Sequence, residues 1–483
     1  MAAAPAPASV EDSIVKVFAM SRGPDVYHPW QKEAPREETG TGIVIEGKRI
    51  LTAFRAVRYS NEVKIQANQA GDKISAKVVL RSSEMDLAVL KLDDESFFDT
   101  HPPLARAQGI PPIKDPVFVY GYPIGGNSLS ITKGIISRVE FTQYGFPTYG
   151  LRVQIDAALN PGNSGGPAVS NGKMVGMALS HLGNGTENIG YVVPNEEIEI
   201  FLGNLAAGTY TRKPGFYQGC HPLENSALRP FLGLPKSEEG TLVGQVESDD
   251  RHYPLKEWDL IEKVGRYAVD DQGMVHEGDL RLDFRYAVQK EAAHGKVAME
   301  IVRAGKHMKV EVPAPNGVEM LVPGVGGDYP PYFIYGPIVF TKATQAFTSG
   351  IMREAGLMGA LTWDASPLLE RRGDQAKFPG EEIVVIPCPF FPNKLGEGYA
   401  RPAFHVVASV NGVKVRNLRH LVELLRDARG DFVTIRFIDR NKEAIVFPRK
   451  ATVEATDQIL SDNGVRAQAS LDLLEAWKAK PSL

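Results

Sequence analysis

The sequence predicts a mainly β fold divided into about three domains, and three observations support this. The chain has 483 residues, which is too long for a single hydrophobic core. Its 47 glycines and 34 prolines are spread along the chain, as expected for many turns. Short apolar runs bounded by turn residues recur from one end to the other, which is typical of strands.

Composition excludes several classes of function. A net charge of −4 gives no reason to expect binding to nucleic acid. The only cysteines, Cys220 and Cys388, are far apart in the sequence, so no disulfide framework is predicted and each is interpreted as a small buried hydrophobe. No run approaches the roughly 18 apolar residues of a membrane-spanning helix. No metal site or cofactor is predicted.

One turn carries the strongest functional signal, Asn160-Pro161-Gly162-Asn163-Ser164-Gly165-Gly166-Pro167. Its glycines permit positive φ and close approach of the backbone. Such a turn can present the Ser164 hydroxyl and direct the N–H groups of Gly162, Asn163 and Ser164 toward an oxyanion. An isolated Gly-Ser-Gly is more often a polar hairpin loop. The extended string with a strand on each side favours a nucleophile turn.

This string resembles the nucleophile loop of trypsin-like serine proteases, specifically of the HtrA/Deg family. Asp86-Leu87-Ala88-Val89-Leu90 is similar to the family segment whose acid orients the catalytic histidine, so the resemblance assigns that role to Asp86. It also implies a chymotrypsin-like double β-barrel over residues 10–208. Two PDZ-like α+β domains are expected to follow.

The catalytic base is missing from the expected position. Where the family has Leu-Thr-Asn-Ala-His-Val-Val, this chain has Leu51-Thr52-Ala53-Phe54-Arg55-Ala56-Val57. Arginine cannot be deprotonated in proteins, so Arg55 cannot accept the proton of Ser164. We expect an ion pair between Arg55 and Asp86; the alternative is that Arg55 points into solvent. Neither His28 nor His181 has an evident route to Asp86.

The strands after Ser164 are expected to wall the substrate pocket, as in the family. The candidates are Met177, Leu179, Ile189 and Tyr191, whose apolar character favours small or medium aliphatic side chains in the substrate. Asn195 is expected to cap a helix that closes this domain. Upstream, Gly40-Thr41-Gly42 is interpreted as a glycine-rich turn.

Tyr27 and Trp30 belong to a polar segment near the N-terminus and have two interpretations. By resemblance they pack between protomers of a trimer, and otherwise they cap the barrel. The small, proline-rich residues Met1 to Ala8 do not form an intact signal peptide. They are either a flexible tail of a cytoplasmic chain or what remains after a signal was removed, in which case the resemblance implies a periplasmic or organellar location.

The two PDZ-like domains are expected from strand and helix patterns. Residues 240–246, 258–265, 297–302 and 309–312 are the predicted strands of the first, and Arg229 to Leu234 is either a carboxylate-binding loop or a helix end. The second ends in a strand–Asn411-Gly412–strand hairpin, a helix after residue 417 and a strand over residues 432–437. PDZ domains add an extended chain end to a sheet edge; the alternative is that these domains only pack or assemble.

The predicted domains are a tail (1–9), the trypsin-like domain (10–208), a linker (209–220), the first PDZ-like domain (221–316), an elaborated second one (317–460) and a C-terminal helical extension (461–483). Two functions remain open. The chain is a serine endopeptidase homologue acting on unfolded or damaged protein, or a pseudoprotease that serves as a peptide-binding scaffold or holdase chaperone. Unfolded or C-terminal peptide segments are the expected partners of either, within a homo-oligomer such as a trimer.

Overall fold

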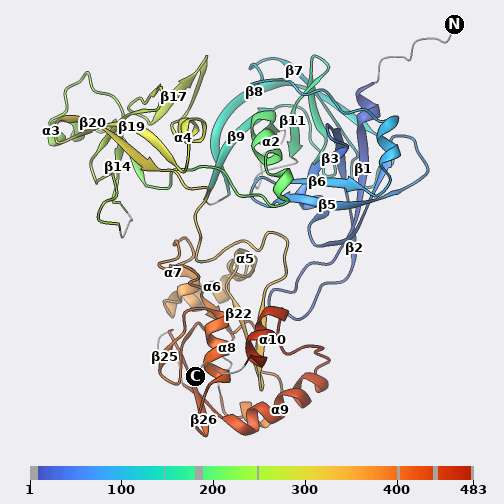
Figure 1. Ribbon diagram of the computed structural model, residues 1–483, viewed down its shortest axis with the longest axis vertical. Coiled ribbons are helices and arrows are strands. Elements are labelled where there is room, and N and C mark those ends of the chain that lie inside the picture. The colour runs from blue at the N-terminus through green and yellow to red at the C-terminus, as the bar shows by residue number, and fades with distance from the viewer. Residues whose placement is uncertain are drawn as a thin grey trace. The chain divides into compact units, whose positions relative to one another are not determined.

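The structure, a computed structural model, describes residues 9–145, 147–179, 189–246, 250–399, 403–438 and 444–479. The chain forms two compact units. The first contains residues 1–21 and 37–318, and the second contains residues 22–36 and 319–483 (Figure 1). No helix in the described part of the chain is long and apolar enough to cross a membrane.

The first unit begins with two closed six-stranded antiparallel barrels, which confirms the predicted chymotrypsin-like double barrel. The first barrel has the strand order β1-β2-β3-β6-β5-β4, and the second has the order β10-β11-β12-β9-β8-β7. Their strands are β1 (Ile14–Ser21), β2 (Arg36–Ile45), β3 (Arg49–Ala53), β4 (Ser60–Ala67), β5 (Ile74–Ser82), β6 (Leu87–Leu92), β7 (Pro116–Gly121), β8 (Ser130–Gly145), β9 (Thr148–Ile155), β10 (Pro167–Ser170), β11 (Lys173–Leu179) and β12 (Gly190–Pro194).

Buried aliphatic side chains explain why these segments close into barrels. Val15, Val17, Ile50 and Leu90 fill the first barrel. The second barrel is filled in the same way by side chains such as Val153. Each fully buried valine or leucine contributes about 1.5–3 kcal/mol, and closure leaves no unpaired edge.

Two local predictions in this region are corrected. Gly40 and Gly42 lie within strand β2 and not in a turn. Close packing explains the glycine there, because a Cβ at Gly42 would stand 2.7 Å from the Ile50 side chain of the paired strand. Asn195 is the first residue of helix α2 (Asn195–Leu202), whose N-cap is Pro194. Its side-chain amide instead donates to the carbonyls of Ala107 and Met174, which fixes α2 to the second barrel.

A five-stranded path with the order β13-β14-β15-β19-β20 follows the barrels, in the region predicted as the first PDZ-like domain. Its elements are α3 (Leu228–Leu232), α4 (Arg285–Glu291), β13 (Cys220–Pro222), β14 (Thr241–Val243), β15 (Leu260–Val264), β16 (Tyr267–Ala268), β17 (Met274–Glu277), β18 (Leu280–Asp283), β19 (Lys296–Arg303) and β20 (Lys306–Pro313). Of the two interpretations of Arg229 to Leu234, the helix end is the one observed, because α3 ends there at the left-handed Gly233.

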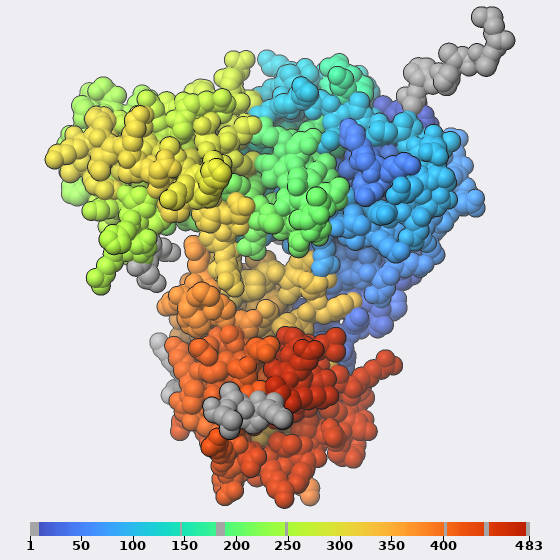
Figure 2. Space-filling view, viewed as in Figure 1, coloured from blue at the N-terminus to red at the C-terminus, as the bar shows by residue number. Residues whose placement is uncertain are grey.

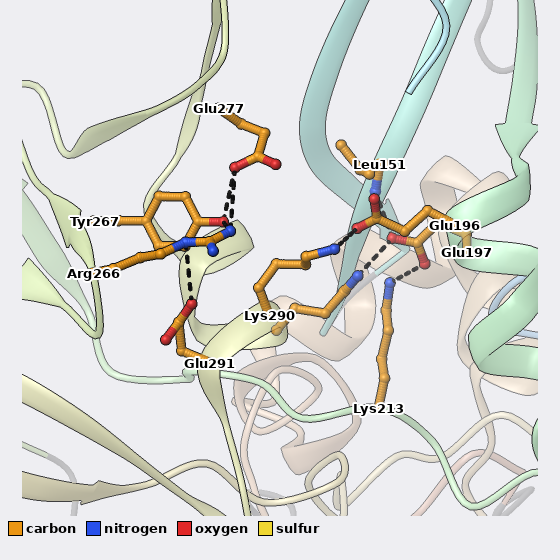
Figure 3. A network of polar contacts seen from close by, with 10 residues as sticks. Leu151, Glu196, Glu197, Lys213, Arg266, Tyr267, Glu277, Lys290 and Glu291 are labelled. Carbon is orange, nitrogen blue, oxygen red and sulfur yellow. Dashed lines mark hydrogen bonds and ion pairs between the residues drawn. The ribbon is translucent and has the colours of Figure 1, made fainter. Parts of the chain in front are cut away.

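A buried ion pair connects helix α2, the linker and helix α4 inside the first unit (Figure 3). Lys213 Nζ lies 2.5 Å from Glu197 Oε2, and both side chains are buried. Glu197 Oε1 accepts hydrogen bonds from the Leu151 backbone N–H and from Gln289 on α4. At the edge of this cluster Lys290 pairs with Glu196. The three-way contact gives the linker a fixed course beside the second barrel.

The second unit is built on two antiparallel sheets with the orders β21-β22-β23 and β25-β24-β26-β27. Its strands are β21 (Tyr332–Tyr335), β22 (Ile338–Lys342), β23 (Val384–Val385), β24 (Val407–Val410), β25 (Val413–Lys414), β26 (Phe432–Phe437) and β27 (Ile445–Pro448). Its helices are α5 (Gln345–Arg353), α6 (Ala355–Trp363), α7 (Pro367–Glu370), α8 (Leu418–Arg426), α9 (Arg449–Asp462) and α10 (Leu471–Lys478). The predicted Asn-Gly hairpin and the helix after residue 417 are both present.

Residues 22–36 leave the first barrel and pack within the second unit. The Tyr27 ring lies 5.8 Å from that of Phe347 and 5.6 Å from that of Phe404. Trp30 packs against Tyr332 and Phe391. The interpretation of these aromatic residues as a cap on the barrel is therefore wrong, while their packing between protomers stays a prediction.

Candidate active site

The turn that carries Ser164 requires glycine at positions that the sequence singled out. Gly162 has φ +100° and Gly165 has φ +90°, both in the region that favours glycine. A Cβ at Gly165 would stand 2.1 Å from the Thr41 carbonyl oxygen, and one at Gly166 would stand 1.9 Å from the Tyr120 carbonyl oxygen. The turn is thus pressed against strand backbone from both barrels.

Thr41 holds this turn and was missed by sequence reasoning. It is fully buried on β2, and its hydroxyl donates to the Gly162 carbonyl at 2.9 Å and accepts from the Tyr122 N–H at 2.9 Å. Its N–H donates to the Ser164 carbonyl. A threonine between two glycines, inside a segment that alternates as a strand, was the available signal. Through Thr41 the first barrel positions the backbone of the second barrel's serine turn.

Asp86 and Arg55 form the ion pair that the sequence predicts. Arg55 Nε donates to Asp86 Oδ2 at 2.6 Å, and the Arg55 backbone N–H donates to Asp86 Oδ1 at 2.9 Å. Arg55 lies on the one-turn helix α1 (Phe54–Val57), whose first N–H groups Asp86 therefore caps. Arg55 thus engages both carboxylate oxygens of Asp86.

Burial has the largest effect on the pKa of Asp86. The Asp86 side chain is 14% exposed and that of Arg55 is 43% exposed. Removal from water raises the pKa of Asp86 above its ordinary value, and the Arg55 charge and hydrogen bonds oppose that rise. Arg152 contributes a weaker opposing field. Without the Arg55 cation and its hydrogen bonds, burial would raise the pKa of Asp86 further.

Arg152 is the second residue that sequence reasoning missed. It lies on β9, is 3% exposed and stacks its guanidinium 3.5 Å from the centre of the Tyr144 ring. Burial lowers its pKa, while Tyr144, Glu197 and Asp86 act in the opposite direction. An arginine between Leu151 and Val153 in an apolar strand was the signal. Its charge adds a second cation to the surroundings of Asp86.

The histidines proposed as substitutes have other surroundings where the structure describes them. His28 Nδ1 lies 2.9 Å from Asp25 Oδ2, within the segment that packs in the second unit. His181 lies outside the described residues. Near the first barrel, His101 stacks on the Phe97 ring at 4.0 Å. Among the described residues, the side chain that pairs with Asp86 is that of Arg55.

The oxyanion candidates divide into two kinds. The Asn163 N–H donates to the Asn160 carbonyl at 3.0 Å, so this donor belongs to the turn. The side chain of Asn163 is fully buried, and a Cβ at Gly121 would stand 2.7 Å from the Asn163 Cα. Gly162 and Ser164 remain the candidate donors, while Asn163 shapes the turn.

The four candidates for the substrate pocket lie in different surroundings. Met177 and Leu179 are fully buried in an apolar cluster that also contains Ile198 and Phe201 of α2. Ile189 and Tyr191 are only half-buried, so they remain the candidates for contact with a substrate. Leu159, just before the serine turn, is a further one, because its side chain lies against Gly190.

Comparison with known proteins agrees with this architecture. Residues 40–177 match the model of the trypsin-like peptidase domain, and residues 324–472 match the model of a PDZ domain. Among solved structures, the HtrA-type protease AlgW with tripeptide is 21% identical with a TM-score of 0.49, over 64% of this chain and 97% of that one.

Two relatives from Arabidopsis thaliana span almost the whole chain. Protease Do-like 2, chloroplastic, is 34% identical over 97% of this chain and 76% of its own length. Protease Do-like 4, mitochondrial, is 32% identical over 93% of this chain and 83% of its own length. The double barrel, the serine turn and the matches to the two domain models define a trypsin-like protease fold joined to a PDZ domain. The chain belongs to the HtrA/Deg family.

Proposed function

We propose that this chain is a pseudoprotease of the HtrA/Deg family, which binds unfolded or C-terminal peptide segments without hydrolysing them efficiently. The observation that carries the proposal is the bonding of Arg55 to both oxygens of Asp86. A guanidinium has no lone pair with which to accept the Ser164 proton. A serine hydroxyl without a general base is a weak nucleophile.

The size of the expected loss supports a non-proteolytic function. In a well-studied serine protease, removing the triad histidine lowers kcat by about 10⁶. That factor corresponds to about 8 kcal/mol of additional barrier.

Under this proposal Ser164 is the nucleophile position, Asp86 the orienting acid and Gly162 with Ser164 the oxyanion donors of an ancestral site. These groups then serve structure: Asp86 caps helix α1, and the turn joins the two barrels.

Peptide binding is the activity that such a chain retains. PDZ domains bind an extended segment as an added strand, and residues 324–472 match that domain. We propose that the chain acts as a scaffold or holdase for such segments, within a homo-oligomer such as a trimer. The runner-up is an active serine endopeptidase, supported by the names of the relatives and by the intact serine turn.

Casein digestion distinguishes the two functions. The native chain, Ser164→Ala and Arg55→His are incubated with casein, and the fragments are quantified. We expect no digestion by the native chain above that by Ser164→Ala. In parallel, the native chain and Ser164→Ala should suppress aggregation of a chemically denatured client equally, as measured by light scattering. Digestion by the native chain that disappears in Ser164→Ala would overturn the proposal.

A further inference from the structure

The open edge of strand β21 in the second unit is covered by the chain's own C-terminal segment, residues 467–479. Strand β21 is the outer strand of its sheet, with β22 on its other side. The Ile334 N–H donates to the Gln468 carbonyl at 2.9 Å, and the Ser470 N–H donates to the Tyr332 carbonyl at 3.0 Å. Phe333 and Ala469 form an antiparallel bridge between these bonds. The segment thus pairs with the edge of the sheet through this β-bridge.

Side-chain hydrogen bonds hold the same stretch of backbone. The Gln468 amide donates to the Ile334 carbonyl at 2.9 Å, and the Tyr332 hydroxyl donates to the Ala467 carbonyl at 3.1 Å. The first contact uses a side chain of the segment, and the second holds its backbone. Such backbone pairing is how PDZ domains hold an extended peptide.

Helix α8 forms the second wall, and helix α10 lies against it (Figure 1). Leu473 and Ala476 of α10 are buried in one cluster with Leu421 and Leu425 of α8. The Trp477 ring lies 5.1 Å from that of Phe333. Arg426 of α8 donates to the Ala476 carbonyl at 2.7 Å. An edge strand, a flanking helix and an apolar floor are all in contact with this one segment.

The C-terminal segment packs on the second unit with one face and leaves its other face exposed to solvent. Leu473 is 2% exposed, whereas Leu471 on the same helix is 81% exposed, so α10 buries only one face. Figure 2 shows the dark red C-terminal residues at the surface of the second unit. Asn463 and the left-handed Gly464 end α9 just before the segment, so the chain bends where the segment begins.

We propose that the groove between β21 and α8 is a peptide-binding site that residues 467–479 occupy in cis. A partner that displaces them is an extended peptide with a backbone strand followed by apolar and aromatic anchors, of which Trp477 is the internal example. The inference concerns the peptide-binding half of the proposed function and does not depend on whether Ser164 is active. The native chain therefore binds such peptides only through the fraction of molecules in which the segment has left.

A trans-binding experiment tests this with the full chain. The probe is a fluorescein-labelled peptide of residues 466–479, and fluorescence anisotropy measures its dissociation constant. Leu473→Asp places a charge on the buried face of α10 and releases the segment, while every residue of the groove is unchanged. Leu471→Asp makes the same change on the exposed face and is the matched control.

We expect Leu473→Asp to bind the probe about ten-fold or more tightly than the native chain or Leu471→Asp, because an occupied site lowers apparent affinity by its open fraction. Ser470→Pro should act in the same direction: it removes the N–H that donates to Tyr332 and, at φ −59°, suits proline. Equal binding by all four proteins would overturn the proposal. Loss of the folded second unit in Leu473→Asp would do the same, because a displaced ligand leaves its receptor folded.

Hydrogen exchange of the native chain provides a measurement that no variant can confound. We expect amides of residues 467–479 to exchange about ten-fold or more faster than those of β24 and β26, because the segment opens without the rest of the unit. Equal protection of the segment and those strands would overturn the proposal. Casein turnover by Ser164 would overturn the loss of proteolysis while leaving both of these results unchanged.

Discussion

Asp86 depends on Arg55 for the charge and the hydrogen bonds around its carboxylate. Its carboxylate is poorly exposed and caps a one-turn helix, so it needs a cation or N–H donors to remain ionised. Arg55 supplies both, through its guanidinium and its backbone. A guanidinium at this position satisfies the electrostatics of the carboxylate and, unlike an imidazole, has no basic lone pair.

Arg55→Met should destabilise the first unit by about 1 kcal/mol at neutral pH, a small value because Arg55 is partly exposed and water screens the pair. Burial already raises the pKa of Asp86, and loss of the cation raises it further. A raised carboxyl pKa means that stability falls as pH rises through it, so the deficit should vanish below the ordinary value of 3.8. Urea unfolding at several pH values measures this. Arg58→Met, at an exposed arginine of the same segment, should show no such pH dependence.

At the scale of single residues, the sequence identified those whose side-chain chemistry differs from what a catalytic site requires. The Arg55–Asp86 pair followed from the two motifs and the properties of the two side chains. Thr41 and Arg152 were not found, because their importance comes from contacts across the barrels that no local pattern encodes. Met177 and Leu179 were assigned to a pocket from the family resemblance and their strand positions, which do not reveal which face of a strand meets helix α2.

The serine turn is the element on which the site depends, and its shape is set by close packing against two strands. Gly165 has both a positive φ and a Thr41 carbonyl in the space of its missing Cβ. Gly172, in the turn between β10 and β11, has a positive φ of +73° with nothing within 4 Å of that space. Substitutions at Gly172 and Gly165 can therefore be compared to separate the cost of backbone strain from the cost of steric overlap.

Gly172→Ala should lower the free energy of unfolding by about 1 kcal/mol, the strain of a left-handed alanine. Gly165→Ala should lower it by about 2 to 3 kcal/mol more, because the strand or the turn must move. Urea unfolding followed by circular dichroism compares the two. Similar losses in both variants would show that the turn is not pressed against Thr41.

Element types were predictable where local signals agreed. Barrel strands with buried β-branched residues, the Asn411-Gly412 hairpin and helix α8 were all expected from the pattern. Gly40 and Gly42 were interpreted as a turn because glycine is common in turns. Within a strand, close packing such as that of Gly42 against Ile50 also requires glycine. Arg229 to Leu234 was ambiguous because glycine ends helices as readily as it forms loops.

Each of the two units depends on contacts between parts of the chain that are distant in sequence. Residues 22–36 leave the first barrel and join the second unit, and Lys213 of the linker enters the buried cluster on α2. The sequence predicted a trypsin-like fold followed by a PDZ domain, and the matches over residues 40–177 and 324–472 confirm both. It did not predict these two connections, because neither a half-polar loop nor a linker lysine has a periodic pattern.

Tyr27→Ala should destabilise the second unit by about 2 kcal/mol, through lost aromatic packing on Phe347 and Phe404. Hydrogen exchange resolved by peptide measures where the effect lies. Protection should fall in β22 and β24 and stay unchanged in β3. A fall confined to the first barrel would restore the interpretation of Tyr27 as a cap on that barrel.

Lys213→Met should destabilise the first unit by about 3 to 5 kcal/mol, because it leaves Glu197 buried without its cation. Lys290→Met removes a more exposed pair with Glu196 and should change stability by less than about 1 kcal/mol. Thermal unfolding of both variants gives the comparison. Equal effects would mean that burial of the Lys213 pair is not what sets its contribution.

The most direct test of the central claim is the rate at which an active-site fluorophosphonate labels Ser164. We expect the native chain to be labelled no faster than Ser164→Ala, and Arg55→His to be labelled in a manner that a second Ser164→Ala change abolishes. Rapid labelling of the native chain that disappears in Ser164→Ala would show that the hydroxyl has a base despite the guanidinium beside Asp86, and would overturn the proposed loss of proteolysis.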